Sequence, residues 1–302
     1  IRRQRQMCIR DRRYCAISPD GQTIAFSYQG DIYTVPSSGG KARQLTTHPA
    51  HDTRPVWSPD GQKIAFASNR SGNFDVFLMN KEGGEPKRLT THSTNEYPTT
   101  FKDNGHVLYL ANVSQDAKDI HFPGTRFMQV YEISTDGGRP DLYSSLYMEN
   151  IALSKDGSKL LYNDYKGYED PWRKHHQSSI TRDIWLCTLG KDRSFQKETT
   201  FGGEDRNPVW AADGASFYYL SEEKGSFNIF KKDLAGNSER QITTHTTHPV
   251  RFLTSDNSGT LCYSYDGEIY TVKEGQKPAK VNIQIVADKI ENDVIHRLMT
   301  DG

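Results

Sequence analysis

The sequence has no long hydrophobic run, no excess of either charge and few cysteines. None of its apolar segments approaches the ~18 residues that a membrane-spanning helix needs, so such a helix is excluded. The 38 basic and 38 acidic residues balance, which argues against a chain that binds nucleic acid along its whole length. The four cysteines (Cys8, Cys15, Cys187 and Cys262) show no C-x-x-C spacing, so neither a zinc ribbon nor a disulfide-rich fold is indicated.

Motifs of known catalytic sites are also missing from the sequence. It contains no G-x-S-x-G elbow, no H-E-x-x-H pair, no glycine-rich phosphate loop and no Walker motif. Serine, histidine and aspartate are all present, but their coexistence does not define a site without geometry. We therefore expect no catalytic residue, no metal site and no cofactor in this segment.

The two ends of the chain differ in character from its middle. Residues 1–12 hold five arginines and one aspartate. A basic arm that contacts nucleic acid is one interpretation; the favoured one is a non-native arm, because the string resembles translated adaptor sequence. The C-terminus stops at Gly302 without a terminating element. We expect the chain to be a fragment, with residues 284–302 beginning a following domain.

A short pattern recurs six times: a polar residue, a β-branched residue and an aromatic residue. The spacings between successive copies are 44, 54, 54, 45 and 40 residues, a period typical of propeller blades. The copies begin at Asp31, Asp75, Gln129, Asp183, Asn228 and Glu268.

Each copy belongs to a larger unit that reads as a four-stranded meander. An apolar run such as Ile24-Ala25-Phe26 precedes the triplet, and a turn such as Pro19-Asp20-Gly21 precedes that run. The sequence therefore predicts an all-β fold, a six-bladed β-propeller of antiparallel blades without strand exchange, whose seam closes by side-chain packing alone. The predicted blades, spanning 13–283 together, are about 14–47, 54–91, 97–144, 150–200, 207–244 and 249–283.

Cys15 departs from the repeat. It stands five residues before the turn aspartate, where Pro55, Pro98 and Pro208 stand in other units. Because it also adjoins the unusual arm, we doubt that Cys15 is native and assign it no chemistry.

The loops between second and third strands are longest in blades three and four. From the aromatic residue that ends the second strand to the polar residue that opens the third, the distances are 5, 9, 20, 21, 9 and 5 residues. These loops share a face of the ring with the connections between blades, here called the loop face. Long insertions on one face are commonly functional. We expect the insertions Val113 to Met128 and Asn163 to Arg182 to contact peptide.

The second insertion mixes aromatic and cationic side chains, a combination suited to holding peptide. The alternative is a loop that packs over its own aromatic residues. The predicted substrate-binding residues are Tyr168, Trp172, Arg173, His175 and His176.

Eight of the ten histidines fall on the predicted loop face. They either follow outer strands or lie in the two insertions. Positions spread around a ring are too far apart to share one ion, so no metal site is expected from them. The eight are His48, His51, His92, His121, His175, His176, His245 and His248.

The full repeat resembles the propeller repeats of TolB, of prolyl oligopeptidase relatives and of tricorn protease. The resemblance is strongest in blades one and two, from Ile17-Ser18-Pro19-Asp20-Gly21 to Leu45-Thr46 and from Trp57-Ser58-Pro59-Asp60-Gly61 to Leu89-Thr90. Six units with the insertion at 168–176, followed by Thr181-Arg182-Asp183-Ile184-Trp185, look like the first propeller of tricorn-type proteases.

That resemblance implies a parent that continues through a second propeller, a PDZ domain and a serine-peptidase core, and that assembles into homo-oligomers. It implies that this propeller gates peptide substrates and acts as a scaffold for the downstream domains. It also implies that the propeller carries out no chemistry itself, binds no nucleic acid and does not span a membrane. The location it implies is cytoplasmic, or periplasmic if the natural N-terminus held a signal peptide. A TolB-like protein-binding propeller and the propeller of a prolyl oligopeptidase relative remain alternatives.

Overall fold

The computed structural model describes residues 12–113, 127–167, 177–236 and 238–286, which form antiparallel four-stranded sheets without helices. No helix in these ranges could therefore cross a membrane. The first three sheets follow the chain in order. Sheet one has β1 (Arg13–Ile17), β2 (Thr23–Tyr28), β3 (Asp31–Pro36) and β5 (Arg43–Gln44). Sheet two has β6 (Asp52–Trp57), β7 (Lys63–Ser68), β8 (Asp75–Asn80) and β9 (Gly83–Arg88). Sheet three has β10 (Glu96–Asp103), β11 (His106–Ala111), β12 (Gln129–Ser134) and β13 (Asp141–Ser144).

The other three sheets repeat the same meander. Sheet four has β14 (Met148–Leu153), β15 (Lys159–Asp164), β16 (Ile184–Thr188) and β17 (Ser194–Lys197). Sheet five has β18 (Asp205–Trp210), β19 (Ser216–Ser221), β20 (Asn228–Asp233) and β21 (Glu239–Gln241). Sheet six has β22 (Arg251–Ser255), β23 (Thr260–Tyr265), β24 (Glu268–Lys273) and β25 (Ala279–Lys280). Two short strands, β4 (Gly40–Lys41) and β26 (Ile283–Gln284), pair with each other.

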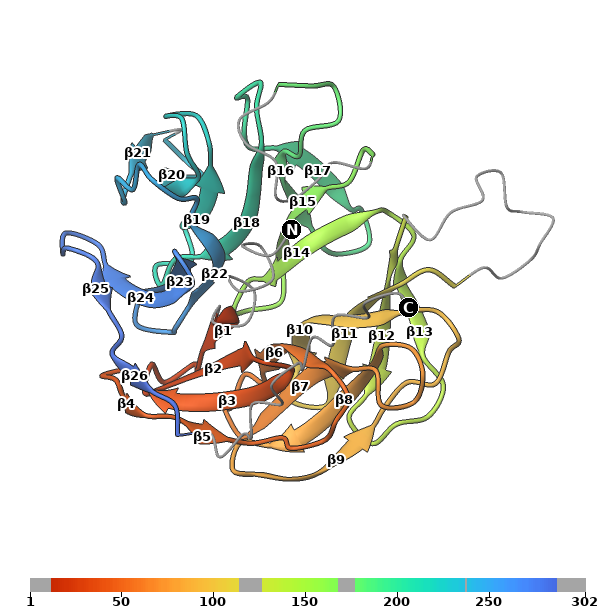
Figure 1. Cartoon of the computed structure of the whole chain (residues 1–302). Helices are drawn as coiled ribbons and strands as arrows, with labels where there is room; N and C mark the ends of the chain where they lie inside the picture. The colour runs from red at the N-terminus through yellow and green to blue at the C-terminus, as the bar shows by residue number, and fades with distance from the viewer. Residues whose placement is uncertain (1–11, 114–126, 168–176, 237, 287–302) are drawn as a thin grey trace, which may run out of the picture.

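The six sheets are the blades of a propeller (Figure 1). The first strands of neighbouring blades contact one another all the way round: β1 with β6, β6 with β10, β10 with β14, β14 with β18, β18 with β22, and β22 with β1. Each blade is built from four strands of its own segment, so no strand is exchanged between blades. The predicted fold, a six-bladed β-propeller without strand exchange, is confirmed.

The Ser-x-Asp-Gly turn joins the first two strands through a small hydrogen-bond network. In blade one, Ser18 Oγ donates to Asp20 Oδ1 at 2.5 Å and accepts from the Thr23 amide at 3.0 Å. Gly21 has a φ of +74°, which glycine adopts without steric cost. The hydrogen bond from Ser18 is the main cause that lowers the pKa of Asp20. The repeated motif is thus a side-chain lock on a tight hairpin.

A threonine follows the outer strand in blades one, two, four and five and has a structural role of its own. Its Oγ1 accepts a hydrogen bond from the amide of a residue at the start of the third strand, which ties the outer strand to its neighbour. The pairs, all at 2.9 to 3.0 Å, are Thr46 with Ile32, Thr90 with Val76, Thr199 with Ile184, and Thr243 with Ile229.

Hydrophobic side chains fill the space between adjacent blades. Between blades four and five, for example, Phe217 packs with Leu161 and Ile184, and all three are fully buried. The same interface is bridged by the indole of Trp210, which donates to the carbonyl oxygen of Ala152 at 2.9 Å. Trp57 makes the equivalent bond from blade two to Ala16 in blade one at 2.9 Å. The blades therefore depend on their neighbours for burial.

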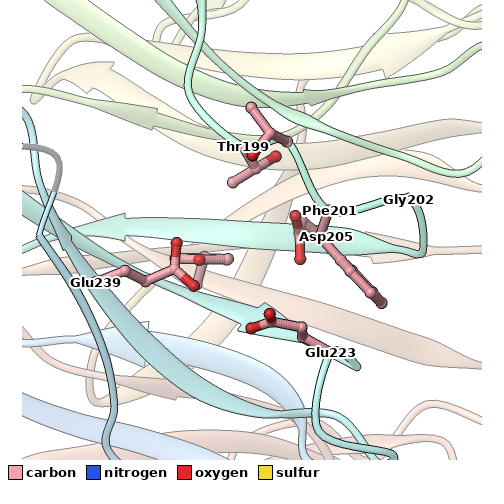
Figure 2. A pocket seen from close by; sticks show the side chains of 8 residues that line it. Thr199, Phe201, Gly202, Asp205, Glu223 and Glu239 are labelled. Atoms are coloured by element: carbon pink, nitrogen blue, oxygen red, sulfur yellow. The ribbon is translucent and has the colours of Figure 1, made fainter.

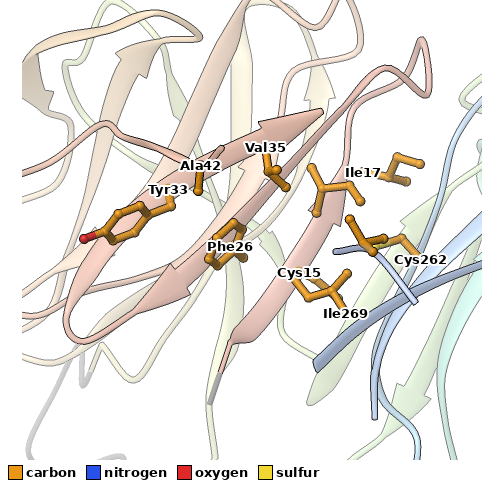
Figure 3. Close-up of a cluster of buried hydrophobic side chains, with 10 residues drawn as sticks. Cys15, Ile17, Phe26, Tyr33, Val35, Ala42, Cys262 and Ile269 are labelled. Carbon is orange, nitrogen blue, oxygen red and sulfur yellow. The ribbon is translucent and has the colours of Figure 1, made fainter. Parts of the chain in front are cut away.

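The seam between blades six and one holds both side-chain and main-chain contacts. Cys15 is buried here with Cys262 and Ile269 (Figure 3). In addition, β26 leaves blade six and pairs in parallel with β4 of blade one, with the Gly40 amide donating to the Asn282 carbonyl at 2.8 Å. The expectation that side-chain packing alone closes the seam was therefore wrong, because the chain after β25 still reaches the outer turn of blade one.

Substitution of Gly39 tests the importance of this main-chain pairing. A Cβ at Gly39 would lie 2.8 Å from the Asn282 carbonyl oxygen, and the residue has a φ of +92°. We expect Gly39→Ala to lower the free energy of unfolding by about 2–3 kcal/mol, from left-handed strain and from displacement of β26. Urea unfolding measures the change.

Gly83→Ala is the matched control. Gly83 occupies the same turn of blade two with a φ of +82°, but a Cβ there would meet only Leu45, at 3.5 Å. Its loss should be about 1–2 kcal/mol, from backbone strain alone. Equal losses in the two variants would mean that the β4–β26 pairing contributes nothing.

Candidate functional site

The inner rim of the ring, defined as the loop-face ends of the first strands, is shaped by a repeated bulge. Five first strands shift register there, and each contains a residue other than glycine with φ between +49° and +56°. Such bulges turn side chains out of the regular alternation. The residues are Tyr14, Arg54, Asn150, Asn207 and Phe252.

On one side of the rim these bulges bring aromatic rings and a cation together. Phe252 of blade six packs against Tyr14 of blade one, with ring centroids 4.4 Å apart. The guanidinium of Arg54 lies 5.3 Å from the Tyr14 ring and 4.2 Å from that of Tyr97 in blade three. All four side chains are half-buried. This row is a surface on which extended polypeptide could stack.

The other side of the rim is a network of charges between blades four and five. Arg182 donates through Nε to Glu149 at 2.9 Å and contacts Glu204 at 3.2 Å, and Arg206 contacts the same oxygen of Glu204 at 3.2 Å. The Arg206 guanidinium also lies 4.2 Å from the ring of Phe227. Burial lowers the pKa of Arg206; in Arg182 the carboxylates of Glu149 and Glu204 outweigh burial and raise the pKa.

The five predicted substrate-binding residues, Tyr168, Trp172, Arg173, His175 and His176, lie outside the described residues. Their role stays a prediction. The described ends of the two insertions do meet, because Phe127 of blade three packs on Tyr165 of blade four with centroids 5.6 Å apart. The described bases of the two insertions are therefore in contact.

A pocket of about 330 Å³ lies at blade five (Figure 2). Its walls come from the connection into blade five, residues 199–202, and from Asp205, Tyr219, Glu223 and Glu239 of blade five itself. Gln177, which belongs to the described C-terminal end of the second insertion, lies next to Gly202. Three carboxylates thus line one concave site.

Asp205 is the most buried of these carboxylates, with an exposed fraction of 1%. Burial raises its pKa to about 7, although hydrogen bonds with Ser221 and Thr199 act in the opposite direction. Its Oδ1 has no hydrogen-bond partner among the described residues. Glu96, which opens blade three as Asp205 opens blade five, also has a pKa of about 7, mainly through burial.

The raised pKa of Asp205 makes stability depend on pH. Below pH ~4 the carboxyl is protonated in both folded and unfolded chains; between pH 4 and 7 only the unfolded chain loses its proton, so stability falls as pH rises. We expect Asp205→Asn to stabilise the protein by about 1–3 kcal/mol at pH 8 and to give no gain near pH 4. Urea unfolding at both pH values measures this. The exposed Asp136→Asn is the control, and a pH-independent effect of Asp205→Asn would contradict the assignment.

Neither the charge network nor the pocket emerged from the sequence. The network joins residues of different blades that do not belong to the repeated pattern, so the repeat could not predict it. One feature of the sequence could have indicated the pocket. The loops 68–75 and 221–228 have equal length, yet Arg70 of the first corresponds to Glu223 of the second. Among the described residues, no three histidine, cysteine or acidic side chains are placed to hold a metal ion.

A closed ring of six four-stranded meanders, with aromatic and charged side chains around its inner rim, defines a β-propeller domain of the repeat type described above. The family described as "Tricorn protease N-terminal beta propeller domain" matches residues 12–278. The chain belongs to this family.

The chain is also similar to individual proteins. The tricorn protease homolog of Saccharolobus solfataricus is 23% identical over 280 residues, covering 89% of this chain and 24% of that protein. The crystal structure of the tricorn protease aligns with a TM-score of 0.75 at 22% identity, over 92% of this chain and 27% of that one. TolB from Acinetobacter baumannii aligns with a TM-score of 0.63 at 14% identity, over 88% of this chain and 62% of that one. The chain spans about a quarter of the length of the tricorn relative.

Proposed function

We propose that this chain is the peptide-gating and scaffolding propeller of a tricorn-like serine protease, and that it carries out no chemistry itself. The observation that carries the proposal is the family match over residues 12–278, nearly the whole propeller. The tricorn relative is about four times as long as the aligned part. On this proposal, the nucleophile, base and oxyanion donors belong to domains outside this sequence. The proposed location is that of the parent protein, the cytoplasm.

The inner rim supplies a physical basis for peptide handling. The row of Tyr14, Arg54 and Tyr97 offers ring faces and a guanidinium to any sequence that passes, because stacking on a peptide backbone is tolerant of side-chain identity. The charge network on the opposite side is buried and internally paired, so it positions blades four and five. A gate needs both a tolerant contact surface and a rigid frame.

The insertion of blade four tests the proposal. Trp172→Ala combined with Arg173→Ala should weaken capture of an unfolded fluorescent peptide by the chain about tenfold, because an aromatic anchor and a cation are lost together. Fluorescence anisotropy measures the affinity. Phe195→Ala with Arg193→Ala, on the outer strand region of the same blade, should leave it unchanged. Equal affinity of the Trp172 and Arg173 variant and the native chain would refute the role of the insertion.

A further inference from the structure

Blades two and five can be compared position by position. In both, the first strand opens with a buried aspartate, Asp52 or Asp205, that pairs with the serine ending the second strand, Ser68 or Ser221. The following loops have the same length, since Ser68 pairs with Asp75 and Ser221 with Asn228. Arg70 and Glu223 therefore occupy the same position in the two loops.

In blade two, Arg70 fills the space beside the aspartate. Its guanidinium donates to Asp52 Oδ2 at 2.7 Å and to Ser68 Oγ at 2.9 Å. It also lies over two rings, 4.9 Å from Phe77 and 5.7 Å from Phe66. Blade two thus neutralises its buried carboxylate with a side chain of its own.

Blade five keeps the surroundings of this guanidinium and lacks the guanidinium. Asp205 and Ser221 correspond to Asp52 and Ser68, and the rings of Tyr219 and Phe230 correspond to those of Phe66 and Phe77. Glu223 replaces the arginine with a second carboxylate, and among the described residues its ion pair is with the exposed Lys224 at 3.5 Å. The place of the missing side chain is the pocket of about 330 Å³.

The buried Asp205 provides the second observation that points to a ligand. Its side chain is almost wholly buried, lines the pocket and leaves Oδ1 without a hydrogen-bond partner among the described residues. Oδ1 of Asp52 is unpaired in the same way, although Arg70 binds its Oδ2, so what blade five lacks relative to blade two is the cation beside the carboxylate. The carboxylates of Glu223 and Glu239 also line the pocket and add negative charge to it.

The arrangement fits a guanidinium better than a metal ion. The carboxylates of the described residues do not converge closely enough to form a metal-ligand group, whereas a guanidinium presents five donors in a plane to acceptors that are spread apart. We propose that the pocket of blade five, here called the arginine slot, binds the guanidinium of an arginine side chain of a peptide. This inference rests on the proposed function for its partner, the peptide.

The arginine slot gives the propeller a preference for peptides that contain arginine. A peptide held at the inner rim or by the second insertion would dock an arginine where blade two docks Arg70. Gln177, in the described C-terminal end of that insertion, lies beside Gly202 of the slot. Peptides with arginine would be retained longer than neutral ones.

The test compares two blocked nonapeptides that differ only in a central arginine or its neutral isostere citrulline. Isothermal titration with the whole chain should show at least about tenfold tighter binding of the arginine peptide, as expected for a charge-assisted contact at a buried carboxylate. Asp205→Asn should reduce the preference to less than about twofold.

In the variant Glu223→Arg, the new arginine side chain should occupy the slot itself. It restores the arginine of blade two, so it should abolish the preference and raise the thermal unfolding midpoint by about 2 °C or more. Glu85→Arg makes the same change of charge on the exposed outer strand of blade two and should alter neither quantity. An unchanged preference in Glu223→Arg would overturn the slot.

A small probe, N-acetylarginine methylamide followed by saturation-transfer NMR, separates the slot from peptide handling. If both nonapeptides bind equally, the slot is overturned and the proposed function stands. If neither nonapeptide binds but the probe binds the native chain and not Glu223→Arg, the slot stands and peptide gating fails. If the probe does not bind the native chain, the slot is overturned.

Discussion

Replacing Arg206 with methionine is expected to lower the free energy of unfolding by about 3–5 kcal/mol. The guanidinium is buried between blades four and five and shares the carboxylate of Glu204 with Arg182. Methionine fills much of the volume but leaves Glu204 short of one cation in a site where its exposed fraction is only 1%. Urea unfolding with a linear extrapolation measures the loss.

Two further variants show whether charge or volume is responsible. Combining Arg206→Met with Glu204→Gln should recover most of the loss, because a neutral amide no longer needs the second cation. Lys102→Met breaks an exposed ion pair with Glu132 of 2.8 Å and should cost less than about 1 kcal/mol. If Arg206→Met cost no more than Lys102→Met, the buried charge of Arg206 would not contribute to the stability of the network.

Phe217→Ala is expected to destabilise the protein by about 3–5 kcal/mol. The ring is fully buried and packs against Leu161 and Ile184 of the preceding blade, so its removal leaves a cavity between two sheets. Because each blade covers its neighbours, the loss should lower the stability of the whole ring. Circular dichroism and tryptophan fluorescence should then report the same unfolding midpoint.

Phe195→Ala is the control for this substitution. Phe195 belongs to the outer strand of blade four and has an exposed fraction of 43%. Its removal should change the free energy of unfolding by less than about 0.5 kcal/mol. Separate midpoints for the two probes in Phe217→Ala would contradict cooperative packing of the blades.

The repeated part of the fold could be predicted from the sequence, because each repeat encodes its own hairpins. Ser18 and Asp20 lock one turn through contacts only two residues apart, and the same local chemistry recurs at Ser58 and at Ser154. Local, repeated interactions leave a pattern that can be counted. Six in-register copies then leave a closed ring as the arrangement that buries both faces of every sheet.

Contacts between blades were harder to predict. The pairing of β4 with β26 joins residues more than 240 positions apart and depends on the ring closing with a particular offset. Likewise, Arg182 and Glu204 meet only after blades four and five are in place. The predicted insertion residues from Tyr168 to His176 remain a hypothesis. The arginine slot could have been suspected from Glu223, but its unpaired Asp205 oxygen is a property of the folded chain alone.

Recovery of bound peptide tests the central claim most directly. The purified chain is incubated with a mixture of unfolded peptides and then separated from free peptide by gel filtration. The retained peptides are identified by mass spectrometry. A gating propeller without chemistry predicts that intact peptides are retained and that no new fragment forms; the arginine slot predicts in addition that the retained peptides are enriched in arginine. Retention of no peptide, or cleavage that disappears when a residue of this chain is changed, would contradict the account.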